Sequence, residues 1–389
     1  MDVMPGYKQT EVGVIPVDWQ EITLDRVAKR GSGHTPDKKH GEYWNGDIRW
    51  ISLADSAALD QVFIDDTISK ITPNGLAHSS AVLHPAGTVV LSRDAGIGKS
   101  AIMRNAMAVS QHFMAWRCGP KLDNRFLYYW LQGAKPQFER IANGTTIQTI
   151  GLQYFKDLKI PLPPLGEQRA IASALSNVDS LLEGLTRLIA KMRDFKQAAM
   201  QQLLTGKKRL GRFKGEWEVK KLGGVVEFEK GQLITEGDAV PGAIPVIAGG
   251  KKPAYFHNRS NRTGKTITIS ASGASAGYVA FFNEPIFASD CTTISESEDY
   301  SIEFVYFQLQ WKQSTIYKAQ TGGAQPHVHA ADISPIEVIW PALAEQTVIA
   351  SILSDMDAEI SVLEARRDKN HALKQGMMQE LLAGRIRLV

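Results

Sequence analysis

PPLGEQ at residues 163–168 is the stretch that decides the fold, because the segment that it opens occurs twice in the chain. Residues 163–210 return 178 positions later as residues 341–388, which open with PALAEQ. Without a gap, 21 of these 48 positions are identical. Unrelated segments would match at about 3 positions, since each common residue makes up less than a tenth of average composition. The repeat predicts a molecule with two similar halves and pseudo-twofold symmetry.

The similarity extends upstream, so each half contains more than a helix. Two segments keep the offset of 178: TVVLS at 88–92 with TITIS at 266–270, and FLYYWLQ at 126–132 with FVYFQLQ at 304–310. Farther upstream the offset becomes 198, and Trp19 and Gly33 correspond to Trp217 and Gly231. The first half therefore carries 20 additional residues between Gly33 and Thr88. Each half is a globular segment followed by a helical one.

Both helical segments carry a heptad pattern of apolar residues. From Ile171 to Leu203, apolar residues alternate spacings of four and three, interrupted only at Lys196, which predicts a long coiled-coil helix. Prolines just ahead of Leu165 and Gly206 just after Leu203 suit the two ends of this helix. The second copy repeats the pattern but has a polar middle, made of Arg367, Asn370 and Lys374.

The length of these helices favours a spacer role. At 1.5 Å per residue, a helix of about 40 residues is about 60 Å long, which is more than a globular core of this size requires. Two copies in one chain meet at a high effective concentration, which favours pairing within the chain over a homo-oligomeric coiled coil.

The globular segments mix strands with short helices. Ile48-Arg49-Trp50-Ile51 and the TVVLS and TITIS segments predict strands. The aromatic segments at 126–132 and 304–310 predict helices. Their N-caps are expected at Asp123-Asn124 and at Asp299 or Ser301.

Composition indicates two or three domains in a reducing compartment. The chain has 389 residues and a net charge of +3, which is too small to indicate nucleic-acid binding by itself. Its two cysteines, Cys118 and Cys291, have no metal-ligand or redox spacing. The sequence has no run of 18 apolar residues and no apolar signal core near Met1, so we expect a cytoplasmic protein without a membrane segment.

The TVVLS and TITIS strands both lead into loops of small residues. The loops are RDAGIGKS at 93–100 and ASGASAG at 271–277, and small residues let backbone amides approach a phosphate or a base edge. Gly98-Lys99-Ser100 resembles the end of a nucleotide-binding P-loop, but that pattern requires glycine where Arg93 stands. A P-loop NTPase is therefore the less favoured alternative. We find no metal-ligand set and no nucleophile–base pair, so the pattern indicates a recognition protein without a catalytic centre.

Together these residues resemble a known family, the DNA-specificity subunits of type I restriction–modification enzymes, over essentially the whole chain. The most specific part is the repeated helical segment, with Leu-x-Glu-Gln near its start and Met-x-x-Leu-Leu-x-Gly near its end. The second half lacks the Gly-x-Thr-Pro and Tyr-Trp-Asn-Gly signatures, in agreement with its shorter length. The other segments that carry the resemblance are YK at 7–8, GVIP at 13–16 with Trp19, GHTP at 33–36, YWNGDI at 43–48, GTT at 144–146 and GAQP at 323–326.

The resemblance implies an α+β fold with an internal tandem repeat and pseudo-twofold symmetry. Two globular α/β target-recognition domains would be separated by two long antiparallel coiled-coil helices. The implied boundaries are 1–160 for the first target-recognition domain, 161–210 for the first spacer helix, 211–339 for the second domain and 340–389 for the second helix.

The resemblance also implies a non-catalytic subunit that reads a bipartite double-stranded DNA target, one half-site per domain. Two methyltransferase subunits would dock on the chain and carry S-adenosylmethionine, so no cofactor is expected in the chain itself. A restriction subunit with translocase activity would join through them. The alternative from another class is a coiled-coil scaffold protein that does not read DNA.

Candidate contact residues follow from this reading. Arg and Lys suit guanine or phosphate, and Asn and Gln suit adenine. The DNA-binding candidates are Thr35, Lys38, Lys39, Arg93, Lys99, Thr145, Thr146 and Gln148 in the first domain, and Lys251, Lys252, Ser272, Gln325 and His327 in the second. Two identical partners require matched surfaces, which suggests Glu167, Gln168, Glu345 and Gln346 as partner-binding candidates. Helix N-terminal capping explains these four residues equally well.

Overall fold

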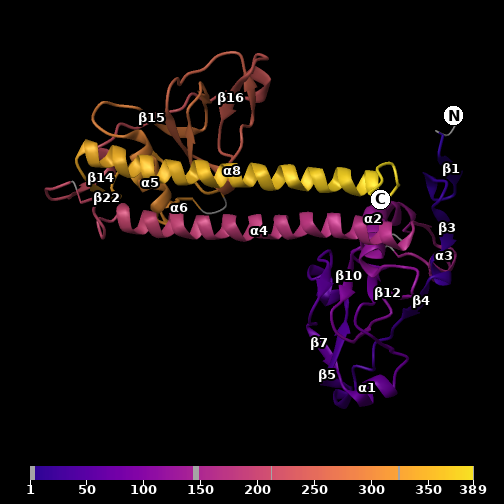
Figure 1. Ribbon diagram of the computed structural model, residues 1–389. Coiled ribbons are helices and arrows are strands. Elements are labelled where there is room, and N and C mark those ends of the chain that lie inside the picture. The colour runs from indigo at the N-terminus through magenta and orange to yellow at the C-terminus, as the bar shows by residue number, and fades with distance from the viewer. Residues whose placement is uncertain (1–4, 143–148, 212, 323–324, 389) are drawn as a thin grey trace. The chain divides into compact units, whose positions relative to one another are not determined.

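The computed structural model describes residues 5–142, 149–211, 213–322 and 325–388, and Figure 1 labels the elements. The chain divides into two compact units. The first combines Met1–Gly184 with Arg367–Val389, and the second is Leu185–Arg366. Each unit therefore contains one globular domain together with part of each long helix. We call the globular parts the first domain and the second domain.

Two sheets form the centre of the first domain. The five-stranded sheet has the order β4 (Ala28–Ser32), β12 (Phe113–Cys118), β9 (Val89–Ser92), β10 (Ser100–Met103) and β6 (Phe63–Ile64). The four-stranded sheet has the order β7 (Ser69–Ile71), β5 (Trp44–Ile51), β11 (Met107–Val109) and β8 (Leu83–His84). Strand β9 is buried on both faces, as expected of a continuous run of apolar residues.

Smaller elements complete the first domain. Helix α2 packs against β9 and β10, and its aromatic residues are mostly buried. Its N-cap is Asp123, whose carboxylate accepts from the backbone of Arg125 and Phe126, so the predicted cap is confirmed. The remaining elements are the pair β1 (Tyr7–Thr10) and β2 (Gly13–Pro16), the pair β3 (Gln20–Thr23) and β13 (Lys159–Leu162), and the helices α1 (Pro73–Ala77), α2 (Asn124–Ile141) and α3 (Leu152–Asp157).

The second domain repeats this topology in a shorter form. Its four-stranded sheet has the order β15 (Glu229–Lys230), β21 (Cys291–Ser295), β18 (Thr266–Ser270) and β19 (Val279–Phe282). Its three-stranded sheet has the order β17 (Tyr255–His257), β16 (Ile244–Ile247) and β20 (Phe287–Ala288). The pair β16–β20 is parallel, as is the corresponding pair β5–β11. The other elements are β14 (Glu218–Lys221), β22 (Glu337–Trp340), α5 (Ile302–Trp311), α6 (Gln313–Lys318) and α7 (Ala330–Ile333).

The additional residues of the first half lie where the change of offset predicts them. Between Gly33 and Thr88 the first domain contains β6, α1 and β8. Of these elements, β6 and α1 have no counterpart in the sheets and helices described for the second domain, whereas the antiparallel bridge Arg262–Ile286 lies at the place equivalent to the pair β8–β11. Strand β6 extends the five-stranded sheet at its edge, which leaves the shared order of the central strands unchanged.

The two long helices have matching bounds. Helix α4 spans Leu165–Leu203 and α8 spans Leu343–Leu381, each 39 residues, so both helices begin and end at equivalent positions of the repeat. Gly206 and Gly384 follow the helices with φ angles of +68° and +67°. This left-handed conformation suits glycine, and the predicted helix ends are confirmed. None of the helices that the structure describes is long and apolar enough to cross a membrane.

In each unit the two helices run antiparallel and are joined by an equivalent lysine–aspartate ion pair. In the first unit the Lys374 ammonium lies 2.6 Å from the Asp179 carboxylate. In the second, Lys196 lies 2.6 Å from Asp357 at the equivalent position. The polar residue that interrupts the heptad pattern in α4 therefore has an intramolecular partner, and so does its equivalent in α8. Asp179 also accepts a hydrogen bond of 2.7 Å from the Tyr129 hydroxyl, which connects this pair to α2.

Candidate nucleic-acid interface

In each domain the same three chain segments meet beside the central sheet. They are the loop after β9 or β18, the turn that precedes β12 or β21, and the segment that leads into α3 or α7. In the first domain, Arg93 N donates to the His112 carbonyl over 3.0 Å, and Ile150 N donates to the Arg93 carbonyl over 2.9 Å. In the second domain the equivalent bonds are those from Ala271 N to Asp290 O, 3.1 Å, and from Val328 N to Ala271 O, 3.0 Å. Equivalent backbone bonds thus hold equivalent loops together.

Side chains of the first domain form a hydrogen-bonded chain across these loops. His112 Nδ1 lies 2.5 Å from Asp94 Oδ2, and the Thr149 hydroxyl donates to the other oxygen of Asp94. On its other side, His112 Nε2 lies 3.3 Å from Gln111 Nε2. The Thr35 hydroxyl donates to Gln111 Oε1 over 2.7 Å. We call these five residues the Gln111 network, and it fixes polar groups of four loops relative to one another.

The second domain places different chemistry on the same scaffold. The Ser272 hydroxyl donates to the Asp290 carboxylate, and these two residues are the equivalents of Asp94 and His112. The backbone of Ser272 also forms an antiparallel β-bridge with that of His327. The His327 ring stacks on the His329 ring, with the two centroids 6.0 Å apart. Two surfaces with one backbone geometry and different side chains are suited to contact two different sequences.

Several predicted DNA-binding residues lie at these loops. Thr35 belongs to the Gln111 network, and Ser272 and His327 belong to the equivalent cluster. Lys38 and Lys39 are exposed in the turn that follows Thr35, and neither forms an ion pair with a residue that the structure describes. The remaining candidates of the second domain, Gln325, Lys251 and Lys252, are exposed, and the Lys251 ammonium lies 5.4 Å from the centre of the Tyr278 ring.

Two other candidates have structural roles. Arg93 donates from Nε to the Ile150 carbonyl over 3.0 Å, and its side chain is only 18% exposed. Lys99 Nζ donates to the Ser56 carbonyl over 3.1 Å. Both cations therefore hold loops of the first domain in place. Thr145, Thr146 and Gln148 lie outside the described residues.

The geometry of the β9–β10 connection contradicts the P-loop alternative. A P-loop joins a strand to a helix whose N-terminus faces the phosphates. Here the loop joins two antiparallel strands, and Ser100 is the first residue of β10. No helix follows the Gly98-Lys99-Ser100 sequence, so the NTPase alternative is wrong.

The four residues expected at a partner surface lie in the interior. Glu167, Gln168, Glu345 and Gln346 are at most 2% exposed. Glu167 accepts from Trp19 Nε1 over 2.9 Å and pairs with Arg387, and Glu345 accepts from Trp217 Nε1 over 3.0 Å and pairs with Arg209. The two glutamines accept from Asp123 N and Ser301 N, which tie each helix start to the domain ahead of it. These residues are the same in the two repeats because each repeat makes the same contacts between its long helix and its own globular domain. The expectation that they form an exposed docking site is therefore corrected.

The buried glutamates raise the pKa of the arginines that pair with them. Hydrogen bonds to Glu167 and then to Asp18 raise the pKa of Arg387. Hydrogen bonds to Glu345 likewise raise the pKa of Arg209. The Arg387 guanidinium also holds the pKa of Asp18 below its ordinary value. Each arginine therefore keeps its positive charge and contributes a charged contact at the start of one long helix.

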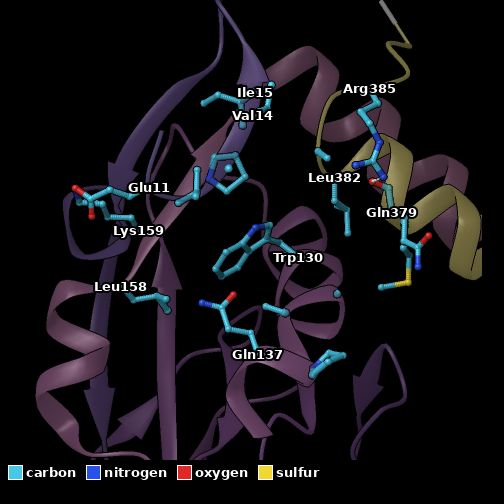
Figure 2. Close-up of a pocket in the computed structure, with 18 of the residues that line it drawn as sticks. Glu11, Val14, Ile15, Trp130, Gln137, Leu158, Lys159, Gln379, Leu382 and Arg385 are labelled. Carbon is cyan, nitrogen blue, oxygen red and sulfur yellow. Dashed lines mark hydrogen bonds and ion pairs between the residues drawn. The ribbon is translucent and has the colours of Figure 1, made fainter. Parts of the chain in front are cut away.

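An open hollow of about 1360 Å³ lies within the first unit. Figure 2 shows the indole of Trp130 in its middle, with Val14 and Ile15 of β2 on one side and Leu382 after α8 on another. The volume exceeds the roughly 300–1000 Å³ of most small-molecule sites. Its charged side chains are engaged, since Lys159 binds Glu11 and Arg385 binds Glu380. The hollow therefore offers apolar contact area.

Sequence reasoning missed the centre of the first interface. Gln111 and His112 carry no motif, and they stand apart from Asp94 in the sequence. They become a set only when β9 and β12 pair and bring their adjoining loops together. The repeat itself could have indicated them, because Asp94 and His112 align with Ser272 and Asp290. At these positions the two halves carry different polar residues next to strands that match.

Comparison with known proteins supports the two-domain reading. The family model for the type I restriction modification DNA specificity domain matches twice, at residues 16–191 and 214–371. The type I restriction enzyme MjaIX specificity subunit of Methanocaldococcus jannaschii is 28% identical over 239 residues, a match of 58% of this chain and 55% of that relative. The MjaVIII specificity subunit of the same organism is 21% identical over 409 residues, 96% of this chain and 94% of the relative.

Two solved structures share the fold. The crystal structure of a type I restriction–modification system S subunit from M. genitalium superposes with a TM-score of 0.65 at 19% identity, covering 93% of this chain and 96% of that one. A structure solved to explain complex assembly and conformational transition of the type I restriction–modification system gives a TM-score of 0.60 at 16% identity. That match covers 96% of this chain and 99% of the other.

Proposed function

This chain belongs to the type I restriction–modification DNA specificity family, and from that premise we propose that it is the subunit that selects the DNA sequence for such an enzyme. It reads a bipartite double-stranded target, with one half-site for each domain. The observation that carries this proposal is the pair of equivalent loop scaffolds with different side chains. One scaffold presents the Gln111 network, and the other presents Ser272, Asp290 and His327.

The long helices have a separate role in the proposal. Residues 161–210 and 340–389 form the spacer between target-recognition domains at 1–160 and 211–339, and so fix the gap between half-sites. Helices of 39 residues, each about 60 Å long, suit this role. The support within each unit is the antiparallel pairing of α4 with α8 through Lys374–Asp179 and Lys196–Asp357.

We assign the chemistry to partner subunits. The chain presents two equivalent sets of elements, which suits two copies of one methyltransferase subunit that carries S-adenosylmethionine and methylates adenine. A restriction subunit joins the same complex, which acts on cellular DNA in the cytoplasm. The open hollow beside Trp130 in the first unit supplies apolar area for such contacts. The candidate DNA-binding residues at the loops, including Lys38, Lys39, Lys251 and Lys252, supply phosphate contacts that weaken as salt rises.

Replacing residues 1–160 with the first domain of another family member tests this proposal. We expect the selected DNA motif to change in one half-site, while the gap and the other half-site stay the same, because each domain reads independently. The measurement is selection of bound duplexes from a randomised pool by the full chain together with the subunits that copurify with it. A change in both half-sites would contradict independent reading, and the absence of any selected motif would favour the scaffold alternative.

A further inference from the structure

Building on the proposed function, we propose that Gln111 reads an adenine in the half-site contacted by the first domain. The side chain is exposed in the turn between β11 and β12, at the centre of the Gln111 network. Glutamine recognises adenine with both groups of its carboxamide, because Nε2–H donates to N7 and Oε1 accepts from the N6 amino group. Thr35 and His112 hold the Gln111 carboxamide in one orientation before DNA binds.

The carboxamide is held at both ends. The Thr35 hydroxyl donates to Oε1 over 2.7 Å, and Nε2 lies 3.3 Å from His112 Nε2. A free glutamine side chain loses rotamer entropy when it is fixed. In this network part of that loss has already occurred on folding, so the cost on DNA binding is smaller.

The same network fixes which end of the carboxamide is the donor. The Asp94 carboxylate, 2.5 Å from His112 Nδ1, accepts a hydrogen bond, so the ring proton resides on Nδ1. The NH₂ end of Gln111 is the group that faces His112 Nε2, and because an amide nitrogen only donates, Nε2 is the acceptor in this contact. A flipped carboxamide would place its oxygen against this acceptor. Asp94 and His112 are therefore positioning residues that act through Gln111.

The free positions of the carboxamide match adenine. After its contacts with His112 and Thr35, Gln111 retains one N–H and one lone pair on Oε1. Adenine presents N7 as an acceptor beside N6 as a donor in the major groove. Guanine presents two acceptors there, so its O6 would meet Oε1 with no hydrogen between them.

The second domain lacks this reading group. The position equivalent to Gln111 holds Ser289, which is 3% exposed and accepts from Ile234 N over 3.2 Å. An internal contact therefore occupies its hydroxyl. The adenine preference assigned to Gln111 is expected in one half-site only.

Selection of bound duplexes from a randomised pool, with the full chain and its copurifying subunits, tests the assignment. For Gln111→Ala we expect the preference for adenine at one position of one half-site to fall about 10-fold or more. The preferences in the other half-site stay unchanged. Gln111→Glu should shift the preference at that position toward cytosine, whose N4 amino group a carboxylate accepts. The matched control is Gln153→Ala, an exposed glutamine on α3 whose Nε2 donates to Asp157 over 2.8 Å, and it should leave the motif intact.

The positioning role has its own readout. His112→Ala removes the acceptor that orients the carboxamide, so discrimination between adenine and guanine should fall at the same position while total DNA affinity changes less. An unchanged motif in Gln111→Ala would overturn the assignment of Gln111 alone. Failure of the wild-type chain to select any motif would overturn the proposed function as well, so the two failures are distinguishable.

Discussion

Arg387→Ala is expected to lower the free energy of unfolding of the first unit by about 3 kcal/mol or more. Its guanidinium pairs with Glu167, whose side chain has no exposed surface, over 2.5 and 2.8 Å. Without Arg387 the carboxylate keeps the hydrogen bond from Trp19 as its one side-chain partner among the described residues, and a buried charge that loses its ion-pair partner costs several kcal/mol. For a unit of this size the midpoint of thermal unfolding should fall by about 6 to 12 °C, measured by circular dichroism.

Arg385→Ala is the matched control for this substitution. It removes the same charge two residues away, but Arg385 pairs with Glu380 at the surface, and both side chains are more than a third exposed. Exposed pairs contribute about 0–1 kcal/mol. Arg209→Ala should reproduce the large effect in the second unit, because Arg209 pairs with the buried Glu345. Equal small effects of Arg387→Ala and Arg385→Ala would contradict the role assigned to the buried pair.

Gly33→Ala is expected to destabilise the first domain and to weaken recognition of its half-site. A Cβ atom at Gly33 would lie 1.6 Å from the carbonyl oxygen of Val109 and 2.5 Å from its carbonyl carbon. Only backbone can move to relieve this overlap, so the cost should reach or exceed the upper part of the roughly 1–3 kcal/mol range for overpacking. The shift also separates the Thr35 loop from the turn that carries Gln111. The measurements are chemical unfolding and selection of bound duplexes.

Gly41→Ala serves as the control for Gly33→Ala. It is the first residue of the short 3-10 helix Gly41–Tyr43, between β4 and β5, and a Cβ atom there would meet no atom within 4 Å. We expect a change of stability within about 0.5 kcal/mol and an unaltered motif. A Gly33→Ala variant as stable as Gly41→Ala would show that the close approach to Val109 is not required. The second domain has the same close approach of a glycine to a backbone carbonyl at Gly231, where a Cβ atom would lie 2.1 Å from the Ser289 carbonyl oxygen.

Local patterns in the sequence were sufficient to predict the helices and the repeat. The heptad pattern and Gly206 predicted α4, and the offset of 178 carried the same bounds to α8. Asp123 and Ser301 were predictable as caps because a cap depends on a few neighbouring residues. The strand order was not predictable, since parallel pairing such as β5 with β11 joins residues more than 50 positions apart.

The candidate site was predicted less well than the fold. Thr35 was identified from its motif, but Gln111, its hydrogen-bond partner, lies 76 positions away and has no local signal. Arg93 and Lys99 have the right chemistry for DNA contact, but backbone carbonyls engage both cations. Glu167 and Glu345 were expected at a surface because they match between the repeats. Identity between repeats cannot distinguish an identical external partner from an identical internal one, and here Trp19 and Trp217 are internal partners.

A map of methylated adenine across the genome of the source cell, with and without this gene, tests the central claim most directly. Our account predicts that deleting the gene removes methylation from one bipartite motif with a fixed gap and leaves all other methylation in place. Restoring the wild-type chain should restore that motif. An unchanged methylation pattern after deletion, in cells that express the partner methyltransferase subunit, would contradict the claim that this chain selects the DNA sequence.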